Sequence, residues 1–219
     1  MTPIAISRLH FPITTLGPGC RIGLWMQGCS IHCPGCISAD TWAKDRGIAT
    51  VDALLSHLEQ WMHAADGITI SGGEPFDQPE ALEALLRGIR LRTSSDILVY
   101  SGYAYEALKR LLLPMSGQID ALIADPFVQG HPQTLPLRGS DNQRLHLLTS
   151  MGEQRFAPFL QPTSAEPSFD VMFDDEGEIW FAGVPSQQAF VRIARTLEEA
   201  GHRVATSQDQ SALQRRTSE

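Results

Sequence analysis

The four cysteines of this 219-residue chain, Cys20, Cys29, Cys33 and Cys36, lie within seventeen consecutive residues, and the rest of the sequence has none. A disulfide framework would spread its cysteines to close long loops, whereas pairs drawn from this group could close only very short ones. Thiols crowded in this way are typical of metal binding in a reducing compartment. The sequence therefore predicts a metal centre near its N-terminus.

The last three cysteines have the spacing C-x3-C-x2-C over residues 29–36. Three thiolates on one compact loop can bind three irons of a 4Fe–4S cluster, which leaves the fourth iron free to accept a substrate. Two alternatives stay open from the cysteines alone. One is a structural zinc site with Cys20 or His32 as the fourth ligand. The other is a cluster capped by Cys20, which would be an electron carrier.

The remaining roles of these two residues also stay open. Cys20 can instead be a small buried side chain, which is the commoner role of an additional cysteine. His32 is adjacent to a predicted ligand, and it can tune the cluster through a hydrogen bond or face solvent.

A glycine-rich segment, Gly72-Gly73-Glu74-Pro75, follows a short apolar strand. Glycine has no Cβ, so the backbone there can approach a ligand closely, although an ordinary turn has the same composition. Ser101 follows the next apolar strand, where it can bond a ligand or cap a helix. Both segments follow predicted strands, and the active sites of parallel βα folds lie at the carboxyl ends of strands.

The elements that must position these residues follow the order of parallel βα units. Apolar residues recur at helical spacing in three segments, residues 51–64, 79–91 and 105–113. Short apolar or alternating runs predict strands at residues 4–9, 68–70, 97–100, 119–123 and 145–148.

The pattern changes near residue 150. A β-hairpin is predicted over residues 171–181, an amphipathic helix over residues 185–200 and a frayed polar tail over residues 208–219. We therefore predict two parts: a core over residues 1–149 and a C-terminal extension over residues 150–219.

Taken together, these motifs resemble the activating proteins of anaerobic ribonucleotide reductase, a family of the radical S-adenosylmethionine (SAM) superfamily. The resemblance covers roughly residues 4–148 and rests on six segments in the expected order: residues 17–21, 24–36 with Thr41-Trp42, 70–75, 100–103, 120–125 and 138–144. The combination of C-x3-C-x2-C with the glycine-rich motif is the most specific part of it.

The resemblance implies an α/β fold, a partial (β/α)6-type TIM-like barrel of the radical SAM kind, with the hairpin and helix as a small extension. It implies that Cys29, Cys33 and Cys36 hold the 4Fe–4S cluster and that SAM chelates the vacant iron. The implied SAM-contacting residues are Gly72, Gly73, Glu74, Pro75, Ser101, Asn142 and Gln143.

The implied activity is reductive cleavage of SAM to a 5′-deoxyadenosyl radical that abstracts hydrogen from a substrate. The implied substrate is a glycine of a partner glycyl radical enzyme, and the implied electron donor is a flavodoxin- or ferredoxin-like protein. Two other functions stay open: a radical SAM maturase or biosynthetic enzyme acting on a peptide or small metabolite, and a non-catalytic iron–sulfur or zinc protein.

The net charge of −8 and pI of about 5.3 argue against a nucleic-acid-coating surface. The sequence has no apolar run of membrane-spanning length and no secretory signal at residues 1–10, so we expect a cytoplasmic protein that binds neither nucleic acid nor membrane.

Overall fold

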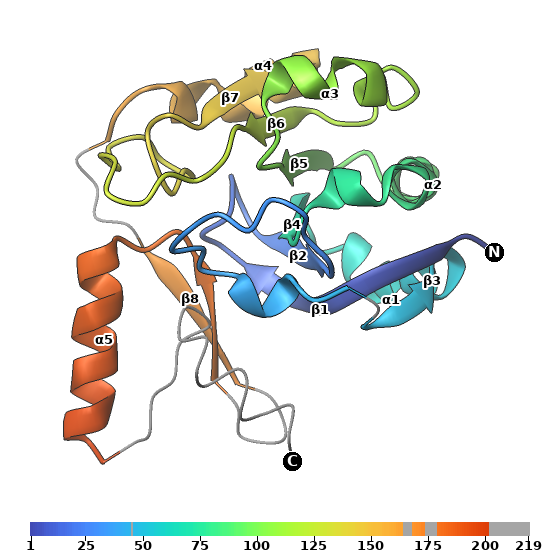
Figure 1. The fold of residues 1–219 in the computed structure, drawn as a ribbon. Coiled ribbons are helices and arrows are strands. Elements are labelled where there is room, and N and C mark those ends of the chain that lie inside the picture. Colours follow the sequence, from blue (N-terminus) through green and yellow to red (C-terminus); the bar gives the residue numbers. More distant parts are fainter. Residues whose placement is uncertain (45, 164–167, 174–178, 202–219) are drawn as a thin grey trace.

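The computed structural model describes residues 1–44, 46–163, 168–173 and 179–201. Its centre is one seven-stranded sheet with the strand order β3-β1-β2-β4-β5-β6-β7 (Figure 1). Four neighbouring strands are parallel: β2 (Arg21–Met26), β4 (Gly67–Gly72), β5 (Asp96–Tyr100) and β6 (Ala121–Ala124). Three strands that pair antiparallel with their neighbours flank them: β1 (Pro3–Ile13), β3 (Ile48–Thr50) and β7 (Arg144–Leu147).

The predicted fold class is confirmed as a mixed α/β structure with a mostly parallel central sheet. The predicted six βα units are not seen, because only four neighbouring strands of the described chain form parallel pairs. The sheet is open, since β3 and β7 form its two edges and do not pair with each other within the described residues. The number six came from the family resemblance, whereas the alternation of elements predicted parallel βα units without fixing how many, because strand direction is decided by long-range pairing.

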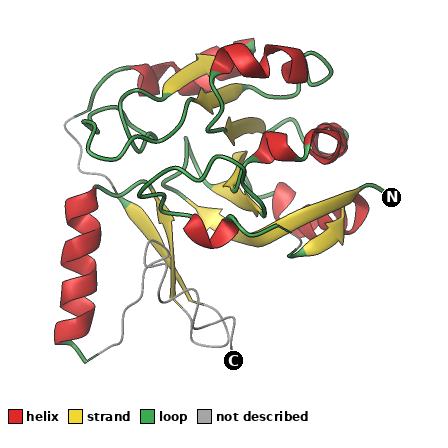
Figure 2. Cartoon of the chain, in the orientation of Figure 1, coloured by secondary structure: helices red, strands yellow, loops and turns green. Residues whose placement is uncertain are grey.

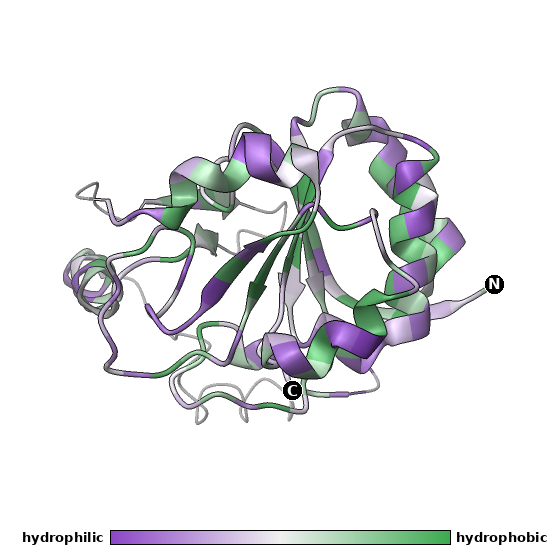
Figure 3. Ribbon diagram, turned by 90° about the horizontal axis from the view of Figure 1, so that it is seen from above, coloured by the Kyte–Doolittle hydropathy of each residue, from purple (hydrophilic) through white to green (hydrophobic). Residues whose placement is uncertain are grey.

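Three helices cover one face of the sheet: α1 (Val51–Met62), α2 (Pro79–Arg90) and α3 (Tyr105–Leu112). Alternate strand residues point to them, as Ile97 and Val99 of β5 do, while Leu98 between them points to the other face. The strands lie in the middle of the molecule with the helices around them (Figure 3). The apolar stripes that predicted these helices are therefore the surfaces that bury the sheet.

The other face is covered only in part. At its β5–β7 side, α4 (Ser150–Phe156) and the 3-10 helix η3 (Ala157–Leu160) pack the fully buried Phe156 against Leu98 and Ile123. At its β1–β2 side lies a hairpin of β8 (Phe169–Phe173) and β9 (Ile179–Gly183), followed by α5 (Gln187–Glu199) (Figure 2). The predicted hairpin and last helix are confirmed, whereas the predicted frayed tail lies outside the described residues. None of the helices in the described part of the chain has the length and apolar character that a membrane crossing needs.

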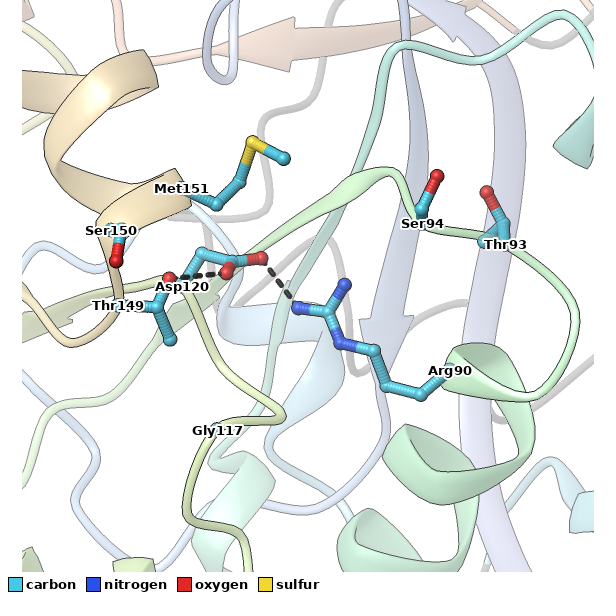
Figure 4. Close-up of a pocket in the computed structure, with 8 residues that line it drawn as sticks. All are labelled: Arg90, Thr93, Ser94, Gly117, Asp120, Thr149, Ser150 and Met151. Carbon is cyan, nitrogen blue, oxygen red and sulfur yellow. Dashed lines mark hydrogen bonds and ion pairs between the residues drawn. The ribbon is translucent and has the colours of Figure 1, made fainter.

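The amino ends of the parallel strands are held by buried ion pairs. Arg21 and Asp96 are both fully buried and lie 2.6 Å apart, and Arg155 of α4 binds the second oxygen of Asp96 at 3.0 Å. Nearby, Asp120 accepts from Arg90 and from Thr149 beside a shallow open depression of about 430 Å³ (Figure 4). Removing one partner would leave the other charge buried and unpaired, so these ion pairs make the amino ends of the strands important for the stability of the fold.

Candidate metal and cofactor site

The loop that carries the cysteines starts at the carboxyl end of β2 and folds back on itself. The amide of Gly28 donates to the carbonyl of Thr41 at 2.7 Å, and that of Cys29 donates to the carbonyl of Trp42 at 3.2 Å. The short 3-10 helix η1 (Ala39–Thr41) shapes the return. Residues 28–42 therefore form a closed loop at the carboxyl end of the sheet, which we call the cluster loop.

The three cysteines of the C-x3-C-x2-C motif line one cavity of about 500 Å³. Cys29 is buried, whereas Cys33 and Cys36 are half-buried. Burial raises the pKa of all three thiols, and backbone amides oppose the shift without cancelling it. Thiolates at such positions need a nearby positive charge, and iron supplies it, because coordination deprotonates a thiol. Three thiols on one loop around one cavity thus fit a 4Fe–4S cluster.

Among the described residues, no group of three or more His, Cys, Asp and Glu side chains is arranged to bind a single metal ion. Cys20 lies just before β2 and Cys29 lies shortly after it, so six strand residues separate them. That is roughly 20 Å of extended chain. Cys20 does not line the cavity, and its amide binds Asp66 at 2.8 Å. This geometry is incompatible with Cys20 as the fourth ligand of either a cluster or a zinc site.

His32 is exposed, and its ring stacks on that of Trp42 with 4.6 Å between the centroids. The Trp42 ring lines the cavity beside Cys36 and lowers the pKa of that thiol, against the larger effect of burial. His32 thus faces solvent and supports Trp42.

The glycine-rich segment is joined to the cluster loop by backbone contacts. Gly73 donates to the carbonyl of Met26 at 2.8 Å, and Glu74 donates to the carbonyl of Gly28 at 2.8 Å. A Cβ at Gly73 would lie 2.1 Å from the carbonyl oxygen of Gly28, and Gly72 has a φ of +100°. Both positions therefore need glycine, one for close approach and one for its left-handed backbone.

Glu74 is a buried carboxylate at the centre of the site. Its oxygens accept from the amide of Phe76 at 3.0 Å, the hydroxyl of Ser101 at 2.8 Å and the amide of Gly102 at 2.8 Å. Desolvation outweighs these three donors and raises the pKa of Glu74 to about 7. The side chain also lines the cavity, so it can respond to a cation placed there.

The raised pKa predicts a pH-dependent stability. Folded Glu74 holds its proton more tightly than the unfolded side chain, so the stability that this group contributes is full below about pH 4.5. It is lost as the pH rises to about 7, by roughly 3 kcal/mol in total. Glu74→Gln cannot ionise, and we expect the metal-free variant to gain stability relative to the wild type as the pH rises from 5 to 8. Urea unfolding of both proteins at several pH values measures this, and parallel curves would contradict it.

The other predicted site residues are only partly brought together. Ser101 and Gln143 line the cavity, whereas Pro75 and Asn142 do not. Pro75 is buried at the start of the 3-10 helix η2 (Pro75–Asp77), and Asn142 donates to the carbonyl of Pro126 at 2.8 Å. Gln143 accepts from the amide of Gly139 at 2.9 Å, so its side chain also braces its own loop.

Sequence reasoning missed several residues of the site. Asp77 accepts from the amide of Ser30 at 2.7 Å and from the Tyr103 hydroxyl at 2.7 Å, which fixes the cluster loop to the loop after β5. Arg8 lines the cavity from β1, and Phe181 lines it from β9. The adjacent aromatic pair at residues 180–181 was the only sequence signal for the contribution of the hairpin.

Comparison with known proteins places this chain in a family. Residues 15–146, more than half of the chain, match the model of a 4Fe-4S single cluster domain. The chain is 35% identical over 136 residues to the anaerobic ribonucleoside-triphosphate reductase-activating protein of Enterobacteria phage T4, covering 59% of this chain and 85% of that protein. It is 31% identical over 148 residues to the protein of the same name from Escherichia coli (strain K12), covering 64% and 96%. It is also 36% identical over 74 residues to the pyruvate formate-lyase-activating enzyme of Listeria monocytogenes, covering 32% and 30%.

Proposed function

Because this chain belongs to the 4Fe-4S single cluster domain family and to that of the anaerobic ribonucleoside-triphosphate reductase-activating proteins, we propose that it is a radical SAM enzyme that activates a glycyl radical enzyme. The observation that carries the proposal is one cavity lined by Cys29, Cys33 and Cys36 on one side and by Gly72, Gly73 and Glu74 on the other. A cluster with one open iron and a site for SAM then share one cavity, as the chemistry requires.

When bound, the cluster supplies one electron for reductive cleavage of SAM to methionine and a 5′-deoxyadenosyl radical, which removes a hydrogen atom from the substrate. The protein contributes position. Cys29, Cys33 and Cys36 would hold the cluster, and Gly72, Gly73 and Glu74 would bind SAM beside it. Glu74 and the carbonyls of the two glycines would accept from the amino group of SAM, and the positive charge of the iron beside it would favour the ionised form of Glu74. Ser101 and Gln143 offer polar contacts from the floor of the cavity.

The parts of the chain are assigned accordingly. Residues 1–149 form the radical SAM core, and residues 150–219 form the extension. We infer that the open sheet is a partial barrel, since three helices cover one face and the cavity lies on the other. The electron donor we propose is flavodoxin- or ferredoxin-like, and the substrate is a glycine Cα of an anaerobic ribonucleotide reductase.

The test is anaerobic reconstitution with iron and sulfide, reduction with dithionite and addition of SAM. We expect 5′-deoxyadenosine and methionine in equal amounts, and a glycyl radical signal by electron paramagnetic resonance (EPR) when the reductase of the same organism is present. SAM cleavage without that radical would favour a maturase acting on another substrate. An intact cluster that never cleaves SAM, with or without the reductase, would contradict the assignment.

A further inference from the structure

The C-terminal extension supplies one wall of the site cavity. Its contributions come from the end of β9, the following turn and α5, and they include Phe181, Val184, Pro185, Val191 and Ala194. All of these residues are uncharged, whereas the facing side carries the thiols and Glu74. The wall also lies outside residues 15–146, the part that matches the family model.

The wall is fixed to the core by a buried cluster and by one carboxylate. Asp170 of β8 accepts four hydrogen bonds, from the amides of Thr14 and Thr15 at 2.7 and 3.2 Å and from their hydroxyls at 2.7 and 2.9 Å. Met172 and Ala182 pack on apolar residues at the β1–β2 side of the sheet, namely Ile13, Leu16 and Trp25. A carboxylate with four donors and a shared apolar core indicate a built interface.

Further contacts tie the wall to the loops of the site. The Arg8 guanidinium lies between two indole rings, 5.6 Å from Trp25 of the core and 4.9 Å from Trp180 of the extension. It also forms an ion pair with Asp40 of the cluster loop. The Gln133 side chain donates to the carbonyl of Val184 at 3.0 Å. The wall is thus positioned relative to the cluster loop.

The rim of the wall leaves apolar surface open at the cavity. Val191 lines the cavity and is 69% exposed, and Ala194 lies about one helical turn farther along the same face of α5. A large partner must insert a peptide segment here, because the hydrogen to be removed has to reach the radical formed at the cluster. Uncharged neighbours of the target glycine fit this wall, whereas the described residues of the wall offer a charged neighbour no charged or polar side chain.

We propose that the extension is the substrate-selecting wall of this enzyme and binds the extended, apolar peptide segment that flanks the target glycine of the partner protein. This inference rests on the proposed activase function. The wall adds selectivity to a shared core, since the residues that hold the cluster and SAM all belong to residues 1–149.

The test compares Val191→Glu with Thr196→Glu, which adds the same charge to α5 at an exposed position that does not line the cavity. Three quantities are measured: cluster content by absorbance, SAM cleavage with dithionite in the absence of partner, and glycyl radical yield by EPR against reductase concentration. We expect Val191→Glu to raise the reductase concentration needed for half-maximal activation about tenfold, because an unpaired charge would be buried on docking. The rate of SAM cleavage without the reductase should stay close to that of the wild type. Thr196→Glu should match the wild type.

The outcomes separate this inference from the proposed function. If Val191→Glu activates the reductase as the wild type does, or if SAM cleavage falls in step with activation, the selecting wall is overturned and the activase remains. If the wild type cleaves SAM and yet forms no glycyl radical on the reductase, both are overturned.

Discussion

Replacement of Cys29, Cys33 and Cys36 together by alanine is expected to abolish the 4Fe–4S cluster and to lower SAM cleavage by more than about 100-fold. Loss of residues that merely orient metal ligands already costs about 10–100-fold, and this variant removes every thiol that lines the cavity. Iron content, the visible absorbance of the cluster and 5′-deoxyadenosine formation measure the effect.

Cys20 provides the matched control within the same chain. It lies at the opposite end of β2, and its amide binds Asp66. Cys20→Ser should therefore keep full iron content and full SAM cleavage. A loss of cluster in Cys20→Ser, or SAM cleavage gained by removing it, would show that Cys20 reaches the cluster and that the electron-carrier interpretation is right.

Gly73→Ala is expected to lower SAM cleavage by about 100-fold, although it changes no group that takes part in the chemistry. The added Cβ would lie 2.1 Å from the carbonyl oxygen of Gly28, a backbone atom that cannot turn away as a side chain does. The glycine-rich segment or the cluster loop must therefore move, and a displacement of about 1 Å near reacting groups can cost about 100-fold in rate. The variant should also lose about 1–3 kcal/mol of stability from overpacking.

The measurement combines SAM cleavage per bound cluster with urea unfolding. Gly117→Ala is the control. Gly117 lies in a turn before the amino end of β6, it has a φ of +73°, and an added Cβ there would have no atom within 4 Å. We expect it to lose about 1 kcal/mol of stability through backbone strain and no activity. Equal SAM cleavage by Gly73→Ala and the wild type would refute the close contact between the two segments.

The sequence was sufficient for the parts of the fold and site that depend on local pattern. Helices α1, α2 and α3 begin and end close to their predicted bounds because their apolar stripes repeat at 3.6 residues. The cysteines and the Gly72-Gly73-Glu74 segment meet in one cavity because the carboxyl ends of parallel strands lie at one edge.

The rest depends on contacts that local pattern does not encode. Helix α4 has Gly152 in its middle, so its propensity is low; it forms because Thr149 caps it and Phe156 is buried against the sheet. Asn142 does not line the cavity, and its side chain donates instead to the carbonyl of Pro126, sixteen residues earlier. The hairpin is held at the site by partners far away in the sequence, such as Thr14, which lies 156 residues before Asp170.

The buried ion pairs among Arg21, Asp96 and Arg155 at the amino ends of the parallel strands have an evolutionary consequence. These ion pairs, and Asp120 with its partners Arg90 and Thr149, lie at the amino ends of the parallel strands, whereas the cavity lies at the carboxyl ends. The residues that stabilise the fold are therefore separate from those that contact substrates. Mutations, insertions or a new terminal segment can then be acquired around the cavity, while the ion-paired residues that stabilise the fold stay unchanged. One scaffold of this kind can diversify its substrates without first having to re-evolve its ability to fold.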